Sequence, residues 1–143
     1  MAVLDASFIV KLVIREPCSG SALAALEEMA GRGEELHAPC IAAAEVANAL
    51  WRHARLLRDV PVEAARRGLG RLERLLRLVE LHPAAGELLG DALRLALEEG
   101  VTVYDALYLA LAARLRQPLY TYDEKLAEAA RGAGVETVVP GCG

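Results

Sequence analysis

The segment Ala2-Val3-Leu4-Asp5-Ala6-Ser7 decides the fold of this chain. Its first three residues, Ala2-Val3-Leu4, form an uninterrupted apolar run that is typical of a short buried strand, and Asp5 ends this strand. Residues 7–14 then carry helical spacing and stop before Pro17. A buried strand that turns directly into a helix is the repeating unit of a parallel α/β sheet, so the rest of the chain is expected to repeat it.

The remaining chain alternates in the same way. Further strands are expected at residues 35–38, 79–82, 118–121 and 135–139, and further helices at 19–30, 41–57, 61–78, 84–99, 104–115 and 124–130. Strands separated by helices predict a parallel sheet covered on both faces. No linker, low-complexity tract or repeat divides the sequence, so we expect residues 1–143 to form a single α/β domain.

Composition and charge narrow the classes of function. The chain is 55% hydrophobic but has one Trp and one Phe, which predicts a core of Leu, Val, Ile and Ala. A net charge of −4 counts against a nucleic-acid binder, although four carboxylates gathered at one metal site would account for it. Charged residues interrupt every apolar stretch before it reaches a membrane-spanning length, so no membrane association is expected.

The cysteines predict neither a disulfide framework nor a zinc site. Cys18, Cys40 and Cys142 are odd in number and irregular in spacing, and they are expected to be packing or surface thiols. The sequence shows no secretory signal pattern, so the expected location is a reducing cytoplasm.

The histidines suggest no catalytic system of their own. His37, His53 and His82 are isolated along the sequence and belong to no Ser/His or Cys/His motif. Each is expected to be a surface or boundary residue.

Four of the twenty acidic residues differ from the rest because their neighbours are apolar. Asp5 and Asp123 each follow a predicted strand, and ligands of parallel α/β sheets bind beyond the carboxyl ends of the strands. Asp105 opens a strongly apolar helix. Glu45 lies one turn into a helix among alanines, which leave room for a group bound to its carboxylate.

Each acid also has a simpler interpretation. Asp5 and Asp123 could cap the helices that follow them, and Thr102 with Asp105 fits an acidic variant of the capping box. Glu45 has no comparable role and could simply be solvated. A shared site explains all four acids together, and capping is compatible with ligation because a helix start favours the ionised carboxylate.

The chemistry of such a site follows from its charges. Carboxylates brought close together repel one another unless a cation lies between them. Ligands that are all oxygen suit Mg²⁺ or Mn²⁺. These ions activate water and stabilise a leaving oxygen, so the acids predict metal-assisted hydrolysis of a phosphoester.

Four segments, in order, resemble the motifs of PIN domains. They are residues 3–7, residues 45–50, residues 102–112 and residues 121–126, the last in a Thr-x-Asp-x-x-Leu pattern. The agreement in order and spacing runs over residues 3–139, and the size resembles that of the VapC toxins of type II toxin–antitoxin systems.

This resemblance implies a three-layer α/β/α fold with a central parallel sheet of four or five strands in the order 3-2-1-4-5. It also implies a Mg²⁺- or Mn²⁺-dependent endoribonuclease, a homodimer and a small VapB-like antitoxin that covers the acidic pocket. By this resemblance the metal ligands and catalytic acids are Asp5, Glu45, Asp105 and Asp123.

The resemblance also implies supporting residues. Ser7 and Thr121 would provide hydroxyls that orient the carboxylates or a water, and Asn48 would orient a ligand or the substrate. RNA contacts are less clear: Arg52, Arg55 and Arg58 recur every third residue and could contact phosphates, but a solvated helix face with local ion pairs is equally open.

Three alternative classes of protein can be considered for this sequence. A PIN-like module that binds RNA or a partner without cutting remains an alternative to the nuclease. A receiver domain needs paired acids after its first strand, and an Asp-x-Asp phosphatase needs an acid two residues after Asp5. Ala6 and Ser7 stand there instead, so neither class fits.

Overall fold

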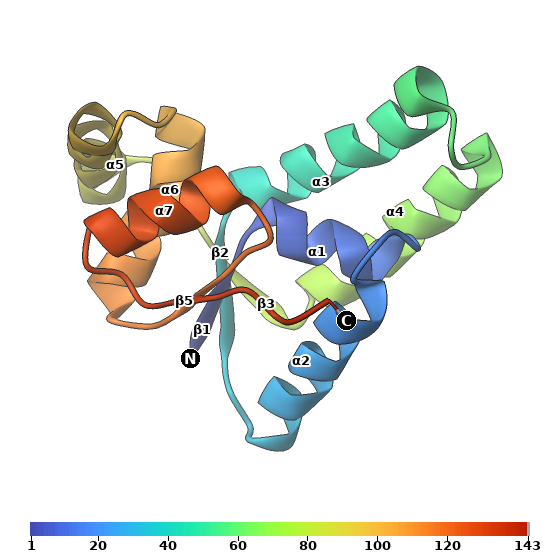
Figure 1. The fold of residues 1–143 in the computed structure, drawn as a ribbon, viewed down its shortest axis with the longest axis horizontal. Helices are drawn as coiled ribbons and strands as arrows, with labels where there is room; N and C mark the ends of the chain where they lie inside the picture. Colours follow the sequence, from blue (N-terminus) through green and yellow to red (C-terminus); the bar gives the residue numbers. More distant parts are fainter. Residues whose placement is uncertain (143) are drawn as a thin grey trace.

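A parallel sheet in the order β3-β2-β1-β4-β5 runs through the molecule (Figure 1). The computed structural model describes residues 1–142. Its strands are β1 (Ala2–Leu4), β2 (Leu36–Pro39), β3 (Val79–His82), β4 (Leu119–Tyr120) and β5 (Thr137–Val138). Every pairing is parallel, with Val3 lying between His37 on one side and Leu119 on the other. The predicted strand order and the parallel α/β class are confirmed.

Helices cover both faces of this sheet and complete the three-layer fold. Figure 1 shows α5, α6 and α7 on one side, and α1 to α4 on the other. The helices are α1 (Ala6–Val13), α2 (Ser19–Gly31), α3 (Ile41–Trp51), α4 (Val62–Leu76), α5 (Gly86–Glu99), α6 (Val103–Leu115) and α7 (Glu124–Gly132). No helix within residues 1–142 is long and apolar enough to cross a membrane.

The core forms around β1 and α6. All three residues of β1 are buried, and so is every residue of α6 from Ala106 to Ala112. Helix α6 packs on the sheet and also against α5, which explains why its sequence is apolar all round and lacks a polar face. The central strand therefore ends at Asp5 inside the protein, and not at its surface.

The helix predicted over residues 41–57 changes character near its middle. It is α-helical to Trp51 and continues as a π-helical segment, η1 (Arg52–Leu57), which ends at Arg58 with φ of 54°. No residue of η1 is buried, so core packing does not hold it in α-helical geometry. The predicted strands at 118–121 and 135–139 are likewise shorter in the structure, at Leu119–Tyr120 and Thr137–Val138.

The prediction that no disulfide forms was wrong. Cys18 and Cys142 are disulfide-bonded, with Cα atoms 4.9 Å apart across a sequence separation of 124 residues. Spacing along the sequence gave no sign of this pair, because the bond depends on the segment after β5 returning to the start of α2. Cys40 is free and exposed, in agreement with the surface-thiol prediction.

Candidate functional site

Asp5 lies at the carboxyl end of β1 and caps α1. Its Oδ1 atom accepts hydrogen bonds from the backbone N of Phe8 at 2.9 Å and from the Ser7 hydroxyl at 2.7 Å. Its Oδ2 atom accepts a short hydrogen bond from the Thr121 hydroxyl at 2.5 Å. The residue is only 2% exposed, so these donors replace the water that a carboxylate would otherwise hold.

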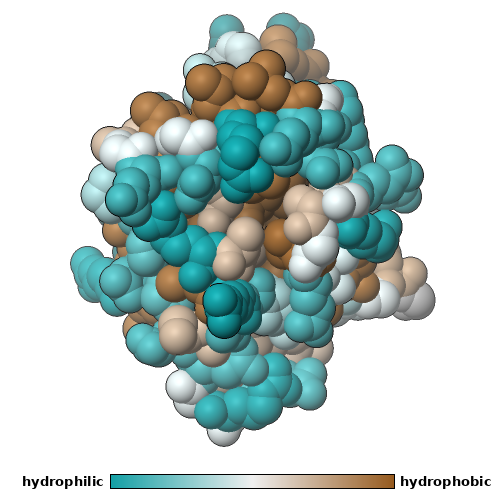
Figure 2. Space-filling model, turned by 90° about the vertical axis from the view of Figure 1, so that its left-hand side faces the viewer, coloured by the Kyte–Doolittle hydropathy of each residue, from teal (hydrophilic) through white to brown (hydrophobic). Residues whose placement is uncertain are grey.

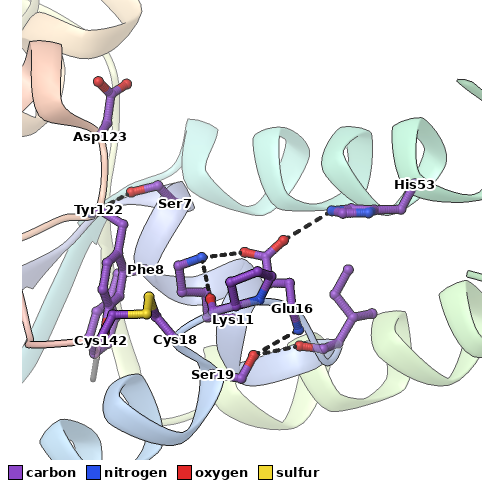
Figure 3. A network of polar contacts seen from close by, with 12 residues as sticks. Ser7, Phe8, Lys11, Glu16, Cys18, Ser19, His53, Tyr122, Asp123 and Cys142 are labelled. Carbon is purple, nitrogen blue, oxygen red and sulfur yellow. Dashed lines mark hydrogen bonds and ion pairs between the residues drawn. A yellow bond between two sulfur atoms is a disulfide. The ribbon is translucent and has the colours of Figure 1, made fainter. Parts of the chain in front are cut away.

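The hydroxyls of Ser7 and Thr121 join the ends of β1 and β4. Thr121 Oγ1 accepts from the backbone N of Asp123 at 2.9 Å, and Ser7 Oγ accepts from that of Tyr122 at 2.8 Å. Figure 3 shows Ser7 reaching from α1 to this backbone, with Asp123 beside it. These two hydroxyls therefore fix the position of the Asp5 carboxylate and of the backbone at Tyr122 and Asp123.

Asp123 and Asp105 lie at the first turns of α7 and α6. Asp123 Oδ1 accepts from the backbone N of Leu126 at 3.1 Å, and the backbone N of Asp105 donates to the Thr102 hydroxyl at 3.1 Å. The capping interpretation therefore holds for Asp5, Asp123 and the Thr102 box. In each aspartate cap one carboxylate oxygen accepts the backbone N–H; the second oxygen of Asp5 accepts from Thr121, whereas the cap of Asp123 uses Oδ1 alone.

Glu45 has a partner that the sequence analysis missed. The hydroxyl of Tyr108 in α6 donates to Glu45 Oε1 at 2.5 Å, and Tyr108 is only 2% exposed. The available signal was its position three residues after Asp105, because residues at that spacing share a helix face. Burial, followed by the charge of Glu45, raises the pKa of Tyr108, so the phenol remains a donor.

The four acids influence one another electrostatically. Burial raises the pKa of Asp5 to about 6, with a further increase from the charge of Asp123, although the three hydrogen bonds oppose the shift. Burial and Asp123 also raise the pKa of Asp105, while burial and Asp105 raise that of Glu45. The carboxylates thus form a connected series in which each negative charge disfavours its neighbour, and a cation would relieve this repulsion.

The four carboxylates are more widely spaced than the ligands of a compact metal cluster. Among residues 1–142, none of the four belongs to a three-residue group whose ligand atoms all lie within 4.8 Å of one another. Mg²⁺ usually keeps several waters and takes only one or two protein carboxylates, so this wider spacing fits a hydrated ion together with a phosphate.

A cavity of about 450 Å³ opens beside Glu45. Asn48 and Arg52 line it together with Glu45, and Tyr104 closes it from α6. Arg55 and Arg58 are not among the described residues that line it. Arg52 and Arg55 lie on the π-helical segment η1 and Arg58 directly follows it, so their directions differ from those on a continuous α-helix, and their contact with RNA stays a prediction.

The histidines have partners in space, and the prediction of surface or boundary positions holds for the half-buried His53 and His82 but was wrong for His37. His53 lies between Glu16 at 3.0 Å and Asp59 at 2.7 Å, and Lys11 binds the same Glu16 at 2.9 Å (Figure 3). His37 and His82 contact each other, and His37 is buried at 3% exposure. Sheet register and loop packing bring these partners together, which sequence spacing does not reveal.

This fold, with acids from four motifs at one end of its sheet, defines the class of the protein. The sequence pattern of the PIN domain family matches residues 2–132, and the chain belongs to that family. PIN nucleases generally depend on divalent metal ions.

Particular relatives lie within this family. The chain is 44% identical over 128 residues to ribonuclease VapC3 of Pyrobaculum aerophilum, covering 88% of this chain and 92% of that protein. It is 38% identical over 96 residues to exonuclease VapC9 of the same organism, covering 66% and 68%. Among solved structures, a toxin–antitoxin complex from Klebsiella pneumoniae matches with a TM-score of 0.71 at 18% identity, covering 99% and 98% of the two chains.

Proposed function

We propose that this protein is a metal-dependent endoribonuclease of the VapC toxin type, which hydrolyses RNA phosphodiester bonds. The observation that carries the proposal is the hydrogen-bonded junction of β1 and β4, where Ser7 and Thr121 hold the Asp5 carboxylate and the backbone of Asp123 together at the carboxyl ends of these strands. The similarity to ribonuclease VapC3 supports the choice of RNA as the substrate.

The proposed roles follow from the contacts of each residue. Asp5, Glu45, Asp105 and Asp123 hold Mg²⁺ or Mn²⁺ and are the catalytic acids. Ser7 and Thr121 hold the Asp5 carboxylate in one orientation, and Tyr108 does the same for Glu45. Asn48 and Arg52 line the adjacent cavity, where they contact the RNA backbone. Arg55 and Arg58 remain weaker candidates for more distant phosphates.

In the proposed hydrolysis the protein positions a water molecule as the nucleophile and supplies no nucleophilic side chain of its own. A bound divalent ion supplies an activated water and neutralises charge on the phosphate. The chain's own acids fix the position of that water and accept its proton, while Arg52 offsets phosphate charge. The short hydrogen bonds to Asp5 keep this geometry fixed before substrate arrives, which lowers the reorganisation needed during reaction.

The decisive experiment compares the wild-type protein with Asp5→Asn on single-stranded RNA in Mn²⁺. We expect cleavage by the wild type and a loss of at least about 100-fold in the variant, with the circular dichroism spectrum unchanged. A circular RNA of the same sequence separates the two modes of attack, since an endonuclease opens it and an exonuclease does not. Equal cleavage by both proteins would assign the activity to a contaminant or a different site.

The second candidate is a PIN-like module that binds RNA or a partner without cutting it. The wide spacing of the carboxylates is the observation in its favour. Calorimetric titration with Mn²⁺ discriminates between the two, because the nuclease requires metal binding that is weakened in Asp5→Asn. Absence of any Mn²⁺ binding by the wild type would leave the non-catalytic module.

The proposed partners follow from the exposed apolar side chains. Trp51, Leu56 and Leu57 are each more than half exposed, at the end of α3 and on η1, and Glu45 lies nearer the start of the same helix. A small antitoxin that packs an apolar segment on these side chains would lie on the helix that carries Glu45. The similarity in fold to a chain from a toxin–antitoxin complex is compatible with this partner, and co-expression with the neighbouring reading frame followed by co-purification tests it.

A second apolar surface suits a homodimer. Leu89, Leu93 and Leu97 recur every four residues on α5 and are exposed. Figure 2 views the side of the molecule where α5, α6 and α7 lie, and apolar surface gathers near its top. We expect Leu93→Ser to shift the protein from dimer to monomer in light scattering. A cytoplasmic location is part of the same proposal, because RNA and an intracellular antitoxin would be met there.

A further inference from the structure

Three side chains on β2 and β3 form a compact cluster that shares no residue with the acidic site. His37 Nδ1 lies 2.9 Å from His82 Nε2 and 3.5 Å from Glu80 Oε2. One ligand atom from each residue lies within 4.8 Å of the other two. Imidazole nitrogens and a carboxylate at such distances are the ligands of many transition-metal sites.

The parallel register of the two strands fixes this cluster. His37 of β2 lies opposite Glu80 of β3, and Pro39 lies opposite His82. Alternate residues of a strand point to the same face, so Glu80 and His82 share one face of the sheet. Backbone pairing therefore brings the three ligands together, with little dependence on flexible side chains.

The cluster extends from the interior to solvent. His37 is 3% exposed, whereas the Glu80 side chain is 63% exposed on β3, an edge strand of the sheet. Burial lowers the pKa of His37 and favours the neutral imidazole, which is the form that binds metals. The ligand atom is Nδ1, which faces His82 and Glu80, while Nε2 is buried on the other side of the ring with no hydrogen-bond partner among residues 1–142.

We propose that His37, Glu80 and His82 bind one transition-metal ion of the Zn²⁺ type, with the remaining position open to solvent. This ligand set suits Zn²⁺ or Co²⁺ better than Mg²⁺, which prefers oxygen. Bonds of about 2.0 to 2.1 Å in tetrahedral geometry place ligand atoms about 3.3 Å apart. The observed 2.9 and 3.5 Å from His37 lie on either side of this value, and Glu80 and His82 lie within 4.8 Å of each other, so the exposed Glu80 side chain completes the site by moving toward the two histidines. The ion joins edge strand β3 to β2 and stabilises the folded protein.

The test uses full-length protein treated with a chelator and then titrated with Zn²⁺ alone. The Asp5→Asn background reduces binding at the acidic site, and His82→Gln and Glu80→Gln remove single ligands of the cluster. His53→Gln is the matched control, because His53 also contacts two carboxylates but lies outside the cluster. Glu80 is exposed enough that its substitution is not expected to disturb folding.

We expect one Zn²⁺ per chain and a rise in Tm of about 5–10 °C at free Zn²⁺ about 100 times Kd. His82→Gln should weaken binding at least tenfold, Glu80→Gln should weaken it measurably, and His53→Gln should leave it unchanged. Co²⁺ should give visible absorption bands of a four-coordinate site, and these should be lost in His82→Gln. Absence of stoichiometric Zn²⁺ binding, or equal binding by His82→Gln, would overturn the proposal and leave the proposed nuclease function untouched.

Discussion

At the scale of single residues, burial of the ionised Asp5 carboxylate positions it for the candidate site but lowers the stability of the folded protein. Its carboxylate is buried and accepts three hydrogen bonds, yet burial still raises its pKa to about 6. Because the folded pKa lies above the ordinary aspartate value of 3.8, the folded protein binds this proton more tightly than the unfolded chain does. The contribution of Asp5 to stability is therefore fully present below about pH 4 and is lost as the pH rises through about 6.

We predict that Asp5→Asn stabilises the metal-free protein at pH 8 by about 1–3 kcal/mol, since an amide carries no buried charge and still caps α1. The gain should shrink as the pH falls from 6 to 4. Denaturant unfolding with a chelator present measures it. Glu73→Gln, which changes an exposed acid outside the site, is the control and should show no such pH dependence. A variant less stable than wild type at pH 8 would contradict the prediction.

Tyr108 gives a second prediction at this scale. Its hydroxyl stabilises ionised Glu45, so Tyr108→Phe should raise the pKa of Glu45 further and weaken Mn²⁺ binding about 10-fold, with a larger loss at pH 6 than at pH 8. Calorimetry at the two pH values measures the effect. Tyr122→Phe removes a buried hydroxyl that has no hydrogen-bond partner within residues 1–142, and it should leave the affinity unchanged.

At the scale of elements, α4 shows how closely the helices on one side of the sheet pack. Gly68 is buried where α4 contacts α1 and α3, and Gly70 lies half a turn further along the same helix. A Cβ atom at Gly68 would lie 3.0 Å from Leu50 and 3.2 Å from the backbone oxygen of Val13, whereas at Gly70 the nearest atom would be 3.9 Å away. Glycine is therefore required for packing at one position and not at the other.

The two glycines make a matched pair. We predict that Gly68→Ala destabilises the fold by about 1–3 kcal/mol, because a backbone carbonyl must move. Gly70→Ala should stabilise it by about 0.5–1 kcal/mol, because alanine loses less backbone entropy in a helix. Urea unfolding of both variants measures the difference, and effects of equal sign would show that α4 packs differently.

At the scale of the whole molecule, the disulfide between Cys18 and Cys142 ties the end of the described chain to the start of α2. It closes a loop that spans 124 residues of sequence, so it restricts the unfolded chain strongly. Because Cys18 precedes α2, the bond attaches the last segment of the described chain to a helix that flanks the sheet. Tyr122, which precedes Asp123, stacks on Phe8 of α1 (Figure 3).

We predict that Cys142→Ser lowers the free energy of unfolding by about 2–4 kcal/mol under oxidising conditions. Reductant should lower the stability of the wild type to the same level and leave the variant unchanged. Cys40→Ser, which removes the free thiol, should respond to reductant as the wild type does. Equal stability of wild type and Cys142→Ser without reductant would show that the bond does not contribute.

The sequence by itself determined the alternation of strands and helices and the placement of Asp5 and Asp123 after buried strands. These features depend on local patterns of apolar residues, turns and caps, and neighbours along the chain suffice to specify them. The strand order followed from the family resemblance, and the structure agrees with it.

Only the tertiary structure decided which distant side chains meet. Tyr108 with Glu45, Cys18 with Cys142, and His37 with Glu80 and His82 come together through helix packing, chain return and sheet register. The change from α-helix to the π-helical segment η1 was also not predictable from the sequence, because no residue of η1 is buried and no apolar pattern marks it. Each of these contacts depends on how two elements lie relative to each other. The periodic pattern of apolar residues within one element does not specify where the other element packs.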